Sequence, residues 1–163
     1  MGNRIEGNLY VAGTLSAETM IVADNSVDDD SVEADAAIAS TKLQHRHHAV
    51  FTQPLSAAAD ETRVIYVAQA AGTLESFGAG SITLNISGST VTVDLKKNGT
   101  TVLTGVVSLS DSGNTAYVLE SGTIASAAYV AGDCFTIVVD ATVGGGTLAT
   151  GLFASAVFDE AAT

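Results

Sequence analysis

The sequence predicts an all-β protein: an antiparallel β-sandwich of the jelly-roll kind, preceded by an extended N-terminal arm. Of the 163 residues, 47% are hydrophobic and 15% are charged, a balance typical of a folded chain. The apolar residues are mostly Ala, Val, Ile and Leu, and much of the chain consists of short β-branched runs separated by Gly, Ser, Asn and Asp. No long amphipathic helix pattern alternates with these runs, which argues against an α/β fold.

Residues 1–47 are predicted to form the arm, with short β segments and an acidic linker. The stretch GNLYVAGTLSAETMIVAD has apolar positions at Leu9, Val11 and Leu15, a spacing that favours one or two brief extended segments. The next stretch, NSVDDDSVEADAAIASTKLQ, is acidic at residues 28–30 and has few large apolar groups. Such a segment cannot offset its own ordering entropy by self-burial. We therefore expect the arm to be flexible or to lie against another chain, which favours assembly.

Residues 48–163 are predicted to form the sandwich. In STVTVDLKK, the side chains of Val91, Val93 and Leu95 fall on one face of a strand, and SITLNI shows the same alternation. The dipeptide Asn98-Gly99 is a hairpin signal, because both residues accept the positive φ angles of a tight primed turn. About eight strands at short spacing are typical of an antiparallel sandwich or jelly roll. They are expected in the segments 48–52, 62–70, 81–87, 89–97, 100–110, 115–121, 133–143 and 151–160.

The charge balance narrows the range of partners. Six Lys and Arg residues face 18 Asp and Glu residues, a net charge of −12. An acidic chain without a basic patch is poorly suited to neutralise phosphates, so we expect no nucleic-acid partner and no membrane partner. The single cysteine, Cys134, excludes an intrachain disulfide and is interpreted as a small residue within a strand. No leader pattern opens the sequence, which predicts a soluble protein made in a cytoplasm.

The sequence offers no pattern that indicates an enzyme. The run at residues 28–30 lacks the glycine and the late glutamate of a calcium loop, so a solvated acidic linker is preferred. The stretch VGGGTLATG has neither the lysine nor the following helix of a phosphate-binding loop. Ser, His and Asp occur without a nucleophile elbow, and no histidine is expected within the sandwich. The pairs Asp60-Glu61 and Asp159-Glu160 are interpreted as solubilising acids in a loop and near the terminus. We expect no catalytic residue and no cofactor.

Several stretches resemble structural proteins of tailed phages. The linker SVDDDSVEADAAIASTKLQHRH is similar to one in which an acidic stretch leads into an AxIxxSKLxHxH-like element. GNLYVAGTLSA resembles the short β repeats that open phage fibre and head-decoration subunits, and residues 48–163 resemble the jelly-roll module of decoration and fibre proteins. Thr41 departs from the serine usual at its place in the linker pattern. The positions that carry the linker likeness are Ala36, Ala37, Ile38, Ala39, Ser40, Lys42, Leu43, His45 and His47.

This resemblance implies a structural virion protein, usually a homotrimer, that docks on a capsid or tail through its arm. The leading expectation is a capsid decoration, or cement, protein on the outer surface of a phage head, with the major capsid protein as its partner. The alternatives are a tail-fibre or baseplate subunit for host recognition and, from another class, a carbohydrate-binding module. Carbohydrate-binding modules usually bind sugars on exposed aromatic rings, and the small number of aromatic residues here argues against that alternative. For a capsid decoration protein, the arm residues expected to be buried against the shell are Leu9, Tyr10, Val11, Leu15, Met20 and Ile21.

The three histidines of the chain, His45, His47 and His48, lie together before the first clear strand. His45 and His47 share one face of an extended segment, and one such pair is too few for a closed zinc site. On the axis of the homotrimer that the resemblance implies, three pairs would supply enough imidazoles for an octahedral transition-metal ion. The preferred interpretation is nevertheless that these histidines are exposed or hydrogen-bonded, so we predict no metal and keep the pair as a candidate.

Overall fold

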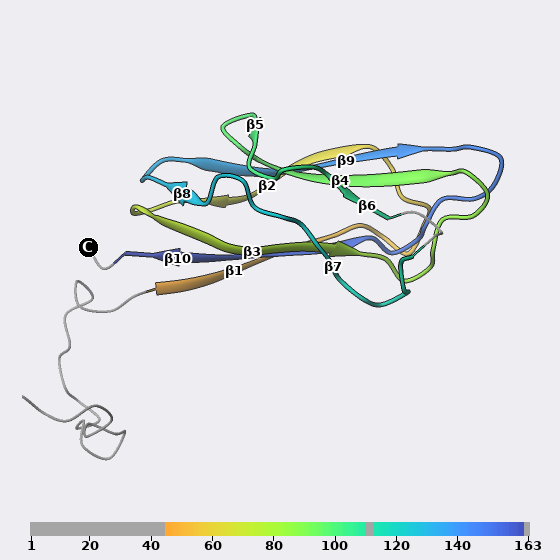
Figure 1. Cartoon of the computed structure of the whole chain (residues 1–163), viewed down its shortest axis with the longest axis horizontal. Helices are drawn as coiled ribbons and strands as arrows, with labels where there is room; N and C mark the ends of the chain where they lie inside the picture. The colour runs from red at the N-terminus through yellow and green to blue at the C-terminus, as the bar shows by residue number, and fades with distance from the viewer. Residues whose placement is uncertain (1–44, 110–112, 162–163) are drawn as a thin grey trace, which may run out of the picture. The chain divides into compact units, whose positions relative to one another are not determined.

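Two antiparallel sheets pack face to face in the computed structural model, which describes residues 45–109 and 113–161 (Figure 1). One sheet has the order β1-β10-β3-β7, with β8 also paired to β3. The other has the order β2-β9-β4-β5, with β6 also paired to β4. No helix occurs among the described residues, and therefore none that could cross a membrane, so the predicted all-β sandwich is confirmed. The strands are β1 (His45–Thr52), β2 (Glu61–Val67), β3 (Gly72–Gly80), β4 (Thr90–Lys97), β5 (Thr100–Thr101), β6 (Val107–Ser108), β7 (Glu120–Ser121), β8 (Ala128–Tyr129), β9 (Cys134–Thr142) and β10 (Phe153–Glu160).

The core lies between the two sheets and is built from alternate residues of the long strands. The side chains of Val91, Val93 and Leu95 are fully buried, as the alternation in β4 predicts. They pack with residues from β9 and with Phe158 from the other sheet, in one continuous apolar cluster. Burial of such side chains between two layers is the main term that stabilises a sandwich.

The predicted hairpin turn is present after β4. Asn98 and Gly99 have φ angles of 50° and 84°, the positive values that a type I′ turn requires. The side chain of Asn98 also donates to Asp133 and accepts from the N–H of Cys134. Cys134 is the first residue of β9, as expected for a small residue within a strand.

The segment 81–87 is not the strand that its apolar alternation predicts. Only an isolated bridge, Thr83 to Thr150, forms there. The reason is Asn85, whose side chain is buried at 1% exposure, donates to the carbonyl of Leu109 and accepts from the N–H of Ala149. Burying this amide turns Ile86 towards solvent, so the alternation does not describe the buried face.

Strand β3 was not among the expected strands, because three glycines interrupt its apolar pattern. These glycines occur where other groups approach the strand closely. A Cβ on Gly72 would overlap the carbonyl of Asp159, and a Cβ on Gly80 would overlap the carbonyl of Val118 and the ring of Phe153. Glycine in a strand often marks such an approach, so the residues that obscure the pattern are required by the packing.

In place of two long strands, the described residues of segments 100–110 and 115–121 form the short strands β5, β6 and β7. Tyr117 has a φ angle of 65°, which an extended strand does not allow. Its N–H donates to the carbonyl of Ser81, which fixes the turn before β7.

The first and last strands lie side by side, and their outer ends coincide. His45 is the register partner of Glu160 in the antiparallel pair β1–β10. The chain therefore enters and leaves the sandwich at the same end. Strand β1 also begins three residues before the predicted start of the sandwich at residue 48, so the N-terminal arm comprises residues 1–44 at most.

Candidate functional site

Only some of the residues singled out from the sequence lie within the described part of the chain. The six arm residues proposed for docking, from Leu9 to Ile21, lie outside it. The three histidines lie on β1, so the expectation that no histidine belongs to the sandwich is wrong. The strand predicted to begin at residue 48 begins at His45, because His45, Arg46 and His47 also pair with β10.

His45 and His47 lie on one face of β1, as the spacing of two predicts. Their rings stack with centroids 6.4 Å apart and planes 18° apart. The ring of His47 also lies 5.7 Å from the ring of Tyr66, which belongs to β2 in the other sheet. His47 therefore faces into the end of the sandwich, between His45 and Tyr66.

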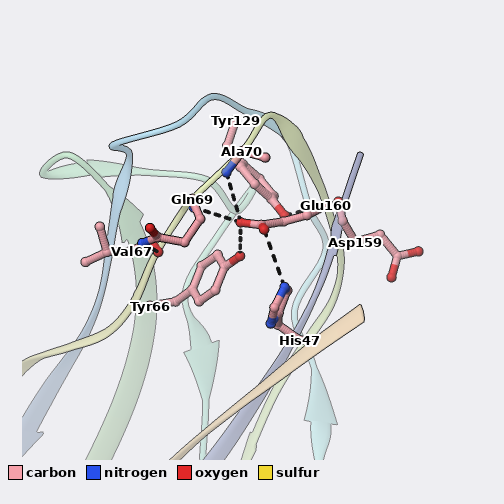
Figure 2. A network of polar contacts seen from close by, with 8 residues as sticks. All are labelled: His47, Tyr66, Val67, Gln69, Ala70, Tyr129, Asp159 and Glu160. Carbon is pink, nitrogen blue, oxygen red and sulfur yellow. Dashed lines mark hydrogen bonds and ion pairs between the residues drawn. The ribbon is translucent and has the colours of Figure 1, made fainter. Parts of the chain in front are cut away.

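Glu160 is the centre of the polar contacts at this end (Figure 2). Its Oε1 accepts hydrogen bonds from the hydroxyl of Tyr66 and from the N–H groups of Gln69, at 2.8 Å, and Ala70, at 3.3 Å. Its Oε2 lies 3.4 Å from Nε2 of His47, which is shielded from solvent; the contact is an ion pair when His47 is protonated, without the geometry of a hydrogen bond. We call these five residues the Glu160 cluster. It joins β1 and β10 to β2 and to the segment that follows β2.

The cluster holds a buried carboxylate in its charged form. Glu160 is only 5% exposed, and burial by itself would raise its pKa. The hydrogen bonds from Tyr66, Gln69 and Ala70, together with the field of His47, outweigh burial and lower the pKa of Glu160 below its ordinary value. Burial, followed by donation to Glu160, raises the pKa of Tyr66 far above its ordinary value. The pair is therefore carboxylate and neutral phenol at neutral pH.

A second ion pair holds the same strands on the outer face of the sheet. Arg46 donates to both carboxylate oxygens of Asp159, from Nε at 2.7 Å and from Nη2 at 2.9 Å. This bidentate contact lowers the pKa of Asp159. Asp159 and Glu160 are 6% and 5% exposed, so their interpretation as solubilising acids near the terminus is wrong. They lie within β10, where each faces a basic side chain of β1.

Aromatic rings pack beneath the cluster. Tyr66 stacks on Phe158 with centroids 4.2 Å apart, and Tyr129 meets Phe135 edge to face at 5.5 Å. The hydroxyl of Tyr129 donates to the backbone carbonyl of Asp159 at 3.1 Å. These rings come from both sheets, so the core continues up to the polar groups and excludes water from their inner side.

Two observations on the described residues bear on what the site could bind. In the described ranges, no three His, Cys, Asp or Glu side chains converge as metal ligands, and no pocket opens. His47 contacts the ring of Tyr66 and the carboxylate of Glu160. One of the two candidate metal ligands, His45 and His47, is therefore already occupied by contacts within the protein. The Glu160 cluster joins β1 and β10 to β2 through these contacts. It holds the strand to which the arm is covalently attached.

No protein-family model and no curated protein sequence matches the chain. Function is therefore inferred from the residues and their geometry. The Glu160 cluster was missed in the sequence because a Glu near the C-terminus, a Tyr in a β-branched run and a His 113 residues before that Glu share no spacing pattern. The one available signal was the clustering of all three histidines at the start of the sandwich, where they turn out to begin β1.

Proposed function

We propose that this protein is a structural virion protein: a homotrimeric capsid decoration, or cement, protein that docks on the major capsid protein of a tailed phage. The observation that carries the proposal is how the arm-bearing strand is held. Strand β1 pairs with β10 along all eight of its residues, and the Glu160 cluster and the Arg46–Asp159 pair reinforce its outer end. A sandwich fastened in this way to a long N-terminal arm is suited to transmit force between a docked arm and an exposed domain.

Docking would depend on the arm. Its apolar residues, Leu9 to Ile21, would be buried against the shell at about 1.5–3 kcal/mol for each fully buried side chain. Many copies on one particle would then hold neighbouring capsomers together, because arms linked to one trimer act at high effective concentration. The net charge of −12 is compatible with this location, since the outer surface of a head does not contact the packaged DNA.

One observation favours the second candidate, a tail-fibre or baseplate subunit that recognises a host surface. Tyr117 is 72% exposed in a left-handed backbone conformation and is followed by exposed Val118 and Leu119. Strained, exposed aromatic residues occur at recognition sites. A carbohydrate-binding module is less well supported, because five aromatic rings of the sandwich are buried in the core: Phe51, Phe77, Tyr129, Phe135 and Phe158.

The proposal is tested on particles that lack the protein. Such particles should assemble but break at a lower temperature, and added full-length protein should restore their stability by binding only the assembled shell. Ile21→Asp should weaken this rescue. Ile86→Asp, the same substitution at an exposed position of the sandwich, is the matched control and should rescue fully. Equal rescue by both variants would place docking elsewhere than the arm.

One further outcome separates the two candidates. Particles that are equally robust with and without the protein but fail to attach to cells would replace the cement role by the fibre role. A shortened variant without the arm should begin at His45, because a start at Ala49 would remove half of β1 and with it the contacts of Arg46 and His47. This variant should fold but fail to rescue the particles.

A further inference from the structure

The outer edge of β1 exposes backbone groups that have no partner among the described residues. Gln53, which continues β1, donates its N–H to the carbonyl of Leu152 at 2.8 Å, so odd-numbered residues of this strand direct their N–H and C=O groups towards β10. The even-numbered residues Arg46, His48 and Val50 direct theirs to the free edge. The carbonyl of Thr52, also on this edge, is capped by Arg63 at 3.3 Å.

Strand β1 is the long, regular edge of the described sandwich. Its eight residues pair with β10 without a bulge. Strand β2, the corresponding edge of the other sheet, is interrupted between Val64 and Tyr66. At the opposite side of both sheets the outermost strands β5, β6, β7 and β8 have two residues each. Bulges and short strands protect an edge from pairing, and β1 has neither protection.

The charges around β1 favour a second copy of this chain as the strand that pairs there. With a net charge of −12, two copies repel each other over most of their surface. Strand β1 carries no acid, and the two acids behind it, Asp159 and Glu160, face Arg46 and His47. Val50, on the same strand, is 67% exposed. Two copies can therefore approach along β1 without bringing unpaired carboxylates together.

We propose that β1 pairs antiparallel with β1 of a second copy, about a two-fold axis at His48. In this register His48 faces the partner's His48, and Arg46 faces the partner's Val50. The three residues with outward backbone groups form about six hydrogen bonds between the copies. The two sheets become one continuous sheet, a mode of association that uses backbone groups in place of an apolar patch.

The β1–β1 pairing goes beyond the proposed docking role, since it joins copies of this chain and does not involve the capsid surface to which the arm would bind. It is isologous, so it joins copies two by two. In a homotrimer, each copy would pair with a copy of another trimer. On a particle, such contacts would connect decoration proteins laterally.

Amide hydrogen exchange of the full chain, measured by NMR, tests the pairing residue by residue. The amides of His47, Ala49 and Phe51 bond within the sandwich and should exchange slowly in every state. The amides of His48 and Val50 should exchange slowly at high protein concentration and much faster on dilution, because their acceptors belong to the other copy. Fast exchange of His48 and Val50 at high concentration would overturn the proposal.

A pair of substitutions at His48 separates backbone from side chain. His48→Pro removes one outward N–H and leaves the β1–β10 bonds in place, since proline is tolerated at the open side of an edge strand. His48→Ala keeps that N–H. In sedimentation equilibrium, His48→Pro should reduce the mass of the assembly to that of the protein without β1–β1 pairing, while His48→Ala should leave the mass unchanged. The slow exchange of Ala49 and Phe51 shows whether His48→Pro still folds.

A second pair of variants leaves the backbone intact. Val50→Lys places a cation opposite the partner's Arg46, whereas Val50→Glu places an anion there. Because each contact occurs twice about the axis, the dissociation constant of the pair should be about tenfold higher for Val50→Lys than for Val50→Glu. Equal constants, or the opposite order, would contradict the register.

Two results would assign the edge to other occupants and overturn the proposal. Slow exchange of His48 and Val50 in a protein that does not associate would mean that the chain's own N-terminal arm covers β1. Slow exchange that appears only on particles would assign the edge to a capsid strand. Failure of the docking proposal is distinguishable, because it changes the rescue of particles and leaves the mass and exchange of the free protein unaffected.

Discussion

Replacement of Glu160 by alanine removes the acceptor of the hydrogen bonds from the Tyr66 hydroxyl and from the N–H groups of Gln69 and Ala70. A buried donor left without a partner costs about 1–3 kcal/mol. Gln69 is exposed and Tyr66 is half-buried, so water can replace part of the lost carboxylate. We therefore take about 1 kcal/mol for each of the three donors and expect Glu160→Ala to lower the free energy of unfolding by about 3 kcal/mol.

A loss of this size is readily measured. For a sandwich of this size it corresponds to a fall in Tm of roughly 10 °C. Urea unfolding at pH 7, followed by circular dichroism, gives the free energy directly. Glu160→Gln keeps one acceptor oxygen but not the charge, and should cost about half as much. Glu120→Ala, on β7, is the control: its carboxylate has no hydrogen bond or ion pair among the described residues, so its cost should stay below about 0.5 kcal/mol.

The pH dependence of the same comparison gives an independent check. The folded-state pKa of Glu160 is lowered, so its contribution is present above the ordinary glutamate value and is lost as the pH falls through the folded value. The difference in stability between the wild type and Glu160→Ala should therefore shrink below about pH 4. If Glu160→Ala and Glu120→Ala were equally stable at pH 7, the cluster would not hold β1 in place.

Three further substitutions probe the polar groups and the close packing. The pKa of Tyr66 is raised, so the folded state resists ionisation of this phenol and the wild type should lose stability above about pH 10. In urea unfolding between about pH 9 and 11, Tyr66→Phe should therefore lose less stability than the wild type. Asn85→Ala should cost about 2–4 kcal/mol, because it leaves two buried backbone groups without partners; Asn114→Ala, which removes one exposed bond, should cost far less. Gly80→Ala should destabilise by about 1–3 kcal/mol through overlap with Val118 and Phe153, whereas Gly105→Ala, in open space, should be nearly neutral in thermal unfolding.

The long strands with distinct faces could be predicted from the sequence. In β4 the alternating apolar residues Val91, Val93 and Leu95 are fully buried, as period-two alternation predicts, although Asp94 on the other face is also buried and accepts a hydrogen bond from Thr101. Segment 81–87 has the same alternation with the opposite result, because the buried side chain is Asn85. A buried amide with two backbone partners cannot be recognised before those partners, Leu109 and Ala149, are placed near it.

The candidate site was less predictable than the fold, because it depends on contacts across the whole chain. That His45 and His47 share a face follows from strand geometry, and their stacked rings agree with it. That His47 would meet Glu160 could not be foreseen, since the pairing of β1 with β10 is a property of the topology. The pairing of β1 with β10 also explains why Asp159 and Glu160 are buried, against the usual preference of acids for solvent, because it places Arg46 and His47 against them.

The pairing of the first strand with the last also affects how the protein is made. Because His45 meets Glu160, the strand that carries the arm cannot be secured until residue 160 has emerged from the ribosome. Sequence-distant pairings of this kind slow folding, because a long loop must close before any contact forms. During synthesis the earlier strands, including β2 and β4, also lack their common neighbour β9. The arm is therefore translated before the strand that holds β1 in the sandwich, so the edge-forming strand β1 of a nascent chain has no β10 to pair with until synthesis reaches residue 160.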